Sequence, residues 1–162
     1  MLHARRSGII ETREDRTIFF DFLQLELARI EGFKPRISLY TVPGQVRYVA
    51  SRKLALQGAD GVVLVADSQF GKRGINIRAM RHLEHNLREL GHNPASFRVV
   101  LQLNKRDLPD VVPEAPLRAE VGRNGAPCLV SVATQGTGVF GTLKTIIRVV
   151  IADTRGRVAG AR

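Results

Sequence analysis

Residues 98–107 read RVVLQLNKRD, an apolar run that ends in four polar residues. A nearly continuous apolar run of this length is typical of a strand covered on both faces, because a strand with one wet face alternates polar and apolar residues. A second such run, GVVLVAD, occupies residues 61–67. The two runs predict buried strands at Arg98–Asn104 and Gly61–Asp67.

Segments with helical periodicity separate the predicted strands. Apolar residues recur every three or four positions from Ile77 to Leu90 and from Gly138 to Val150, with charged or polar residues between them. Weaker patterns predict helices at Val46–Leu56 and Pro113–Arg123, and further strands at Thr17–Leu23, Arg36–Val42 and Pro127–Val132. Strands that alternate with helices indicate an α/β fold with a mainly parallel sheet and helices on both faces.

Length and composition indicate one globular domain over residues 1–162, with 44% apolar residues. The sequence contains neither a run of about 18 apolar residues, which a membrane span needs, nor a secretory signal. The single cysteine, Cys128, excludes an intrachain disulfide and suits a reducing compartment. We therefore expect a cytoplasmic protein, with a frayed basic tail at residues 155–162.

The net charge of +10 has two explanations. Five of the 25 basic residues are lysine and the rest arginine, a bias that GC-rich codons alone can produce. Binding to nucleic acid would instead require basic residues interleaved with aromatic ones that stack on bases. The aromatic residues make up 6% of the chain and lie in strand-like runs, which disfavours nucleic-acid binding.

Residues 104–107, which close the strand predicted at 98–104, match a pattern for guanine recognition, Asn-Lys-x-Asp. In open α/β sheets, ligands bind beyond the carboxyl ends of the strands, where these residues fall. Asp107 can accept hydrogen bonds from N1 and N2 of guanine, Asn104 can anchor the loop, and the stem of Lys105 can lie against the purine. The alternative is a charged loop that caps the next element.

Two further loops follow predicted strands. In residues 41–45, TVPGQ, the N–H of Gly44 can donate to a terminal phosphate and Gln45 can orient an attacking water. A simple Pro-Gly turn would account for the same letters. In residues 132–136, VATQG, a backbone N–H at Ala133 or Thr134 can contact a guanine carbonyl.

The order and wording of these motifs resemble the MglA-type bacterial small GTPases, a Ras-like family of gliding motility and cell polarity. The resemblance runs from about Glu11 to Val150 and rests on residues 15–23 (DRTIFFDFL), 39–46 (LYTVPGQV), 50–54 (ASRKL), 61–68 (GVVLVADS), 104–109 (NKRDLP) and 138–140 (GVF). Thr41 occupies a position where most Ras-like proteins carry Asp. MglA-type proteins also carry Thr there. The resemblance implies a Ras-like P-loop NTPase fold.

Site roles follow from the resemblance. It implies that Arg16 is an intrinsic arginine finger, that Thr17 ligates Mg²⁺, that Gln45 positions water and that Gly44 senses the γ-phosphate. Asn104, Lys105, Asp107, Ala133 and Thr134 would hold the base of GTP or GDP. Arg16 as a surface arginine and Thr17 as an ordinary strand residue are the alternatives.

The 162 residues contain no G-x-x-x-x-G-K-[ST] motif, the P-loop that cradles the β- and γ-phosphates. By resemblance, we expect the chain to lack the first strand, the P-loop and the first helix, with residues 1–14 as a flexible lead-in to switch I. A start codon assigned too late and a genuine pseudo-GTPase are both compatible with this. Either way we expect impaired nucleotide binding and leave GTPase activity open.

Two functions stay open at this point. The first is a GTP-binding and GTP-hydrolysing switch that acts with an MglB-like roadblock-domain activator and with effectors at switches Asp15–Leu23 and Gly44–Leu54. The second is a pseudo-GTPase that binds a roadblock-type partner without nucleotide.

Overall fold

The computed structural model describes residues 3–7, 21–26, 36–42, 49–122 and 125–160. These residues fall into two compact units, residues 1–58 and residues 59–162. That the two units make up a single domain stays a prediction. No helix within the described ranges combines the length and the apolar character needed to cross a membrane.

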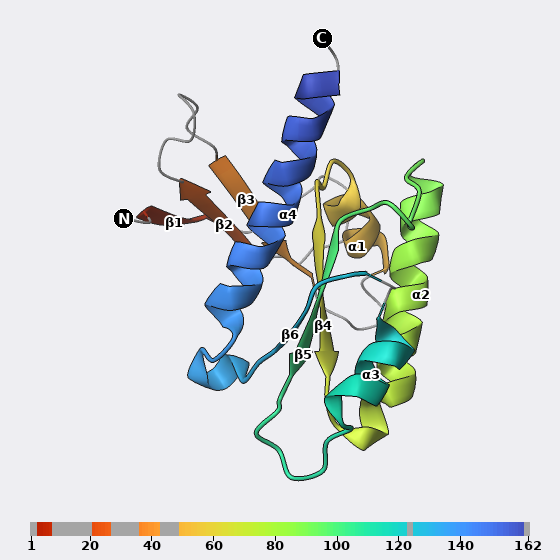
Figure 1. Ribbon diagram of the computed structural model, residues 1–162. Coiled ribbons are helices and arrows are strands. Elements are labelled where there is room, and N and C mark those ends of the chain that lie inside the picture. Colours follow the sequence, from red (N-terminus) through yellow and green to blue (C-terminus); the bar gives the residue numbers. More distant parts are fainter. Residues whose placement is uncertain (1–2, 8–20, 27–35, 43–48, 123–124, 161–162) are drawn as a thin grey trace. The chain divides into compact units, whose positions relative to one another are not determined.

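The first unit contains an antiparallel sheet in the order β1-β2-β3. Its strands are β1 (His3–Ser7), β2 (Asp21–Glu26) and β3 (Arg36–Thr41), and helix α1 (Val49–Leu56) follows them (Figure 1). At one end of the β2–β3 pair, Glu26 lies opposite Arg36, and their charged groups are 3.8 Å apart. Such an exposed cross-strand pair stabilises the sheet only modestly.

Sequence predictions for this unit are met in part. Strand β3 lies within Arg36–Val42 and α1 within Val46–Leu56, as predicted. Strand β2 overlaps the predicted Thr17–Leu23 but continues to Glu26, and residues 17–20 lie outside the described residues. Strand β1 was not anticipated within the lead-in at 1–14, because its sequence, HARRS, has no apolar run and its strand conformation depends on pairing with β2.

The second unit contains a parallel sheet in the order β4-β5-β6, built from β4 (Val62–Asp67), β5 (Val99–Asn104) and β6 (Cys128–Val130). Its α-helices are α2 (Arg73–Glu89), α3 (Glu114–Val121) and α4 (Val139–Gly160), with the short 3₁₀ helices η2 (Phe70–Lys72) and η3 (Ala133–Gln135). Figure 1 shows α4 on one face of this sheet and α2 with α3 on the other. The predicted parallel sheet with helices on both faces is confirmed.

The core of the second unit surrounds the central strand β5. Val100 and Leu103 are fully buried and Leu101 is 1% exposed, so both faces of the strand are covered, as its apolar run predicted. Leu87 of α2 and Leu117 of α3, both 0% exposed, belong to the same core. Burying a side chain of this size stabilises the fold by about 1.5–3 kcal/mol.

The C-terminal ends of helices α2 and α4 can be compared with the ends that the sequence predicted. Helix α2 ends before Gly91 as predicted, because Gly91 takes a left-handed φ of +79° and the N–H of His92 then returns to the carbonyl of Leu87. Helix α4 continues to Gly160, and the frayed tail expected at 155–162 stays a prediction. An established helix gains one hydrogen bond for each residue added, which favours this extension.

Strand β6 is shorter than the predicted Pro127–Val132, and the loop after it is tightly packed. Gly138 has a φ of +76°, and a Cβ at this position would lie 2.1 Å from the carbonyl oxygen of Val130. Gly136 has a similar φ of +74°, but nothing lies within 4 Å of its Cβ position. The close approach at Gly138 therefore brings the start of α4 against the end of β6.

We expect Gly138→Ala to destabilise the protein more than Gly136→Ala. The change at 136 should cost about 1–2 kcal/mol, the penalty of a left-handed backbone for a residue with a Cβ. The change at 138 adds the overlap with Val130. Urea denaturation of the two variants measures the difference, and equal free energies of unfolding would show that the loop relaxes without cost.

Candidate functional site

The loops after β4, β5 and β6 meet at one edge of the parallel sheet. Asp67 lies opposite Asn104 in the strand register, and Leu103 lies opposite Val130. Main-chain bonds continue this pairing past the strand ends: Ser68 N–H donates to Asn104 O at 3.0 Å, and Ser131 N–H donates to Leu103 O at 2.8 Å. The carboxyl ends of the three strands are thus held side by side, where α/β folds bind ligands.

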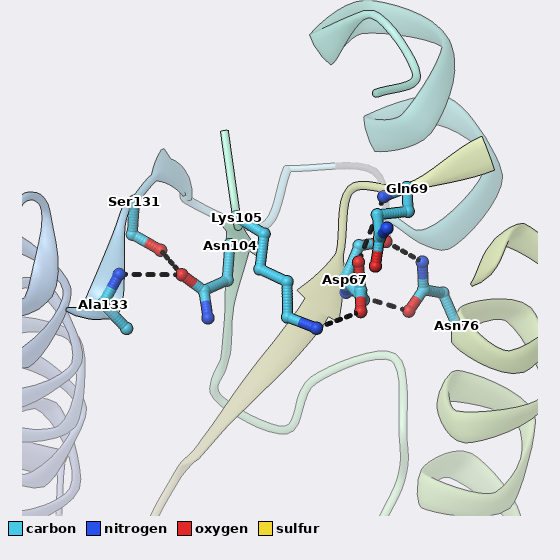
Figure 2. Close-up of polar contacts among 7 residues, drawn as sticks. All are labelled: Asp67, Gln69, Asn76, Asn104, Lys105, Ser131 and Ala133. Atoms are coloured by element: carbon cyan, nitrogen blue, oxygen red, sulfur yellow. Dashed lines mark hydrogen bonds and ion pairs between the residues drawn. The ribbon is translucent and has the colours of Figure 1, made fainter. Parts of the chain in front are cut away.

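Asn104 connects its own loop to the loop after β6. Its Oδ1 accepts hydrogen bonds from the N–H of Ala133 at 3.0 Å and from the hydroxyl of Ser131 at 3.1 Å (Figure 2). The side-chain nitrogen, Nδ2, has no acceptor among the described residues. Asn104 therefore anchors the loop, as the sequence predicted, and keeps one donor unused.

Lys105 points to the other side of the loop, towards the end of β4 (Figure 2). Its φ is +63°, and among the described residues no other residue except glycine has a positive φ. A left-handed backbone at a residue with a Cβ costs about 1–3 kcal/mol and tends to occur at functional sites. Its Nζ donates to Oδ2 of Asp67 at 2.7 Å, a contact that partly offsets this strain.

The carboxylate of Asp67 is held from two sides. Oδ2 faces Lys105, and Oδ1 accepts from the N–H of Gln69 at 3.1 Å. Partial burial raises the pKa of Asp67, but the hydrogen bonds from Lys105 and Gln69 and the charges of Lys105 and Lys72 outweigh it and hold the pKa below its usual value. The stabilising contribution of the ionised form is therefore present above the unfolded-state pKa and is lost as pH falls through the lowered one.

Arg106 and Asp107 have different roles in the loop. The guanidinium of Arg106 donates to the carbonyl of Val112 at 2.6 Å, and the N–H of Leu108 donates to the carbonyl of Lys105 at 3.4 Å. Asp107 is exposed, and its carboxylate has no hydrogen-bond or ionic partner among the described residues. The loop thus presents the carboxylate of Asp107 to solvent, while hydrogen bonds hold the backbone on either side of it.

Comparison with known proteins identifies the family. No protein-family profile matches the chain. The chain is 47% identical over 146 residues to the mutual gliding-motility protein MglA of Myxococcus xanthus (strain DK1622), an alignment that covers 90% of this chain and 75% of the relative. The chain belongs to the MglA family of small GTPases. The parallel sheet and its helices accordingly belong to a Ras-like fold.

Other predicted site residues lie outside the part of the MglA-family chain that the structure describes. These are Arg16, Thr17, Gly44 and Gln45, and with them residues 15–20 and 44–48 of the two expected switches. Among the described residues, no three His, Cys, Asp or Glu side chains are grouped to hold a metal ion. The Mg²⁺ ligand proposed at Thr17 stays a prediction.

The loop after β6 differs in one detail from its expected role. The N–H of Ala133, expected to contact a guanine carbonyl, donates to Asn104 instead. The N–H of Thr134, one residue on, has no acceptor among the described residues. The amide that this conformation leaves available to a ligand is therefore that of Thr134.

Asp67, Asn76 and Ser131 hold the loops through hydrogen bonds, although no sequence motif assigned them a role. Asp67 had a usable signal, because it ends an apolar strand as Asn104 does. Strand β4 is not covered on both faces as its apolar run predicted, since Val65 is 53% exposed. Asn76 is one of two polar residues, with Asn86, on the buried stripe of α2, and Ser131 directly follows a strand. Neither feature specifies a hydrogen-bond partner, so their roles emerge only from the structure.

Two buried serines allow the support of Asn104 to be tested. Ser131, 1% exposed, bonds to Asn104, whereas Ser68 is 0% exposed and its hydroxyl has no partner among the described residues. We expect Ser131→Ala to lower the free energy of unfolding by about 1 kcal/mol and Ser68→Ala to leave it unchanged or raise it. Chemical denaturation measures both, and a greater loss in Ser68→Ala would contradict these assignments.

Proposed function

We propose that this chain is a GTP-binding and GTP-hydrolysing switch of the MglA family that controls gliding motility or cell polarity in the cytoplasm. The observation that carries the proposal is the exposed carboxylate of Asp107, which has no partner among the described residues, on the loop that Asn104 anchors. A carboxylate in that state is ready to accept hydrogen bonds from a ligand. Its position beyond the end of β5 is where ligands bind in this class of fold.

Guanine offers groups that complement the unused groups of the site. Its N1–H and N2–H₂ are two donors on one edge, which the two oxygens of Asp107 can accept together. Its carbonyl can accept from the N–H of Thr134, and a ring nitrogen can accept from Nδ2 of Asn104. Adenine lacks the first two donors and the carbonyl, so the same groups would disfavour it.

Lys105 would supply the flat contact with the base. Its side chain is 48% exposed although its Nζ is held by Asp67, so the stem between them is accessible while its end is fixed. An apolar stem held in one place can cover the face of a purine with little further loss of side-chain entropy. The ion pair with Asp67 therefore prepares the stem for that contact.

Hydrolysis would use residues assigned by family membership. Gln45 would orient the attacking water, Arg16 would neutralise charge that develops on the γ-phosphate, and Gly44 would donate its N–H to that phosphate. Mg²⁺, which neutralises phosphate charge, would take Thr17 as a ligand. An MglB-like roadblock-domain protein would activate hydrolysis, and effectors would bind at the switches 15–23 and 44–54.

A fluorescent GTP analogue tests nucleotide binding directly. We expect a saturable signal that unlabelled GTP and GDP reverse and that ATP does not. The affinity should be lower than that of a GTPase with a P-loop, because residues 1–162 contain no such motif. Absence of saturation at micromolar protein would favour the alternative, a pseudo-GTPase that binds a roadblock-type partner without nucleotide.

Asp107→Asn tests the assignment of the base-reading group. An amide cannot accept both guanine donors, so we expect guanine nucleotides to bind at least about 100-fold more weakly, the loss of two hydrogen bonds to a charged group. Xanthine nucleotides, which carry a carbonyl in place of N2, should bind the variant better than guanine nucleotides do. Asp110→Asn, another exposed aspartate of the same loop, is the control and should bind like the unmodified chain.

A further inference from the structure

Asn76 places an amide inside the apolar core of the second unit. It lies on the buried stripe of α2 with Met80, Leu83 and Leu87, and it is 5% exposed. A buried amide destabilises a fold by a few kcal/mol unless hydrogen bonds replace its lost contacts with water. Its partners therefore account for the stability of a polar residue at this position.

Both ends of the Asn76 amide bond to the main chain of one residue, Asp67. Its Oδ1 accepts from Asp67 N–H at 3.1 Å, and its Nδ2 donates to Asp67 O at 2.8 Å (Figure 2). Val62 and Ser68 donate their N–H groups to carbonyls on the β5 side. Because N–H groups alternate in direction along a strand, the main-chain groups of Asp67 point away from β5, and Asn76 satisfies them as a neighbouring strand would.

This arrangement fixes where the Asp67 carboxylate stands. With its N–H and carbonyl held by α2, the last residue of β4 cannot rotate freely, and its side chain meets Lys105 at 2.7 Å. Lys105 in turn has the strained φ of +63°. A continuous chain of contacts thus runs from helix α2 through the end of β4 to the loop after β5.

We propose that Asn76 and Asp67 are positioning residues for guanine recognition, which hold Lys105 in its left-handed conformation with its stem ready to cover the base. The inference rests on the proposed function for its ligand, but the positioning itself is a property of the nucleotide-free chain. Asn76, which lies on helix α2 and does not itself contact the base, would then control the affinity for the guanine nucleotide.

The positioning is tested first without nucleotide. The N–H of Arg106 donates to the carbonyl of Ser131 in the loop after β6, and the N–H of Leu108 donates to the carbonyl of Lys105. Their exchange with solvent deuterium, followed by NMR, therefore reports the opening of the loop after β5. Asn76→Ala should accelerate their exchange roughly tenfold. Asn86→Ala is the matched control: Asn86 is 6% exposed on the same helix, about 15 Å further along, and its loss should not change exchange in the loop.

Equal exchange at Arg106 and Leu108 in the two variants would overturn the inference, whether or not nucleotide binds. If Asn76→Ala does not fold, Asp67→Asn serves in its place, because it keeps both main-chain bonds to Asn76 and removes the charge that faces Lys105. Faster exchange is expected for that variant too, and unchanged exchange would again contradict the positioning role.

A double-mutant cycle then separates positioning from general support of the fold. In the unmodified chain, Asn76→Ala should weaken binding of the fluorescent GTP analogue about tenfold. In a Lys105→Met background the same change should have no further effect on affinity, although it should lower stability equally in both backgrounds. A loss of affinity that persists without Lys105 would assign Asn76 a structural role only.

The two proposals fail in distinguishable ways. If the unmodified chain does not bind the analogue, the proposed function fails for this polypeptide, and the exchange measurement alone decides whether Asn76 positions the loop. The other case is that the chain binds the analogue, but Asn76→Ala changes neither the exchange in the loop nor, by way of Lys105, the affinity. The proposed function then stands and the positioning role is rejected.

Discussion

The parallel register that places Asp67 opposite Asn104 is the constraint on which the second unit depends. Side chains of a strand alternate between faces, so a shift of one residue in β4 or β5 would turn each of them to the wrong side of the sheet. The burial of β5 on both faces opposes any such shift, because Val100, Leu101 and Leu103 would all lose their packing. Apolar packing in the core therefore sets the positions of the polar groups at the sheet edge.

At that edge, two consecutive residues, Asn104 and Lys105, form hydrogen bonds to segments on opposite sides of the loop after β5. Asn104 fastens the loop after β6, and Lys105 fastens the end of β4. The left-handed backbone at Lys105 is what allows two consecutive side chains to serve both sides. Its cost is local, about 1–3 kcal/mol, and the contacts with Asp67, Ser131 and Ala133 connect the loop after β5 to the end of β4 and to the loop after β6.

The sequence predicted the parts of the molecule whose structure is determined locally. The apolar run at Val99–Leu103 correctly indicated a strand covered on both faces, and the position of Asn104 after it correctly indicated an anchored loop. The hydrogen-bond partners of Asn76 and Ser131 were not predictable, because they are set by tertiary packing between distant segments. Strand β1 was missed for a related reason, since its pairing with β2 determines its conformation.

The close approach of Gly138 to Val130 also bears on how the family can vary in sequence. The loop after β6 is positioned by main-chain geometry, and the group it leaves available, the N–H of Thr134, belongs to the main chain as well. Side chains at positions 134 and 135 are exposed and are not needed for either property. Substitution of these two side chains would therefore leave both the shape of the loop and its available main-chain donor in place.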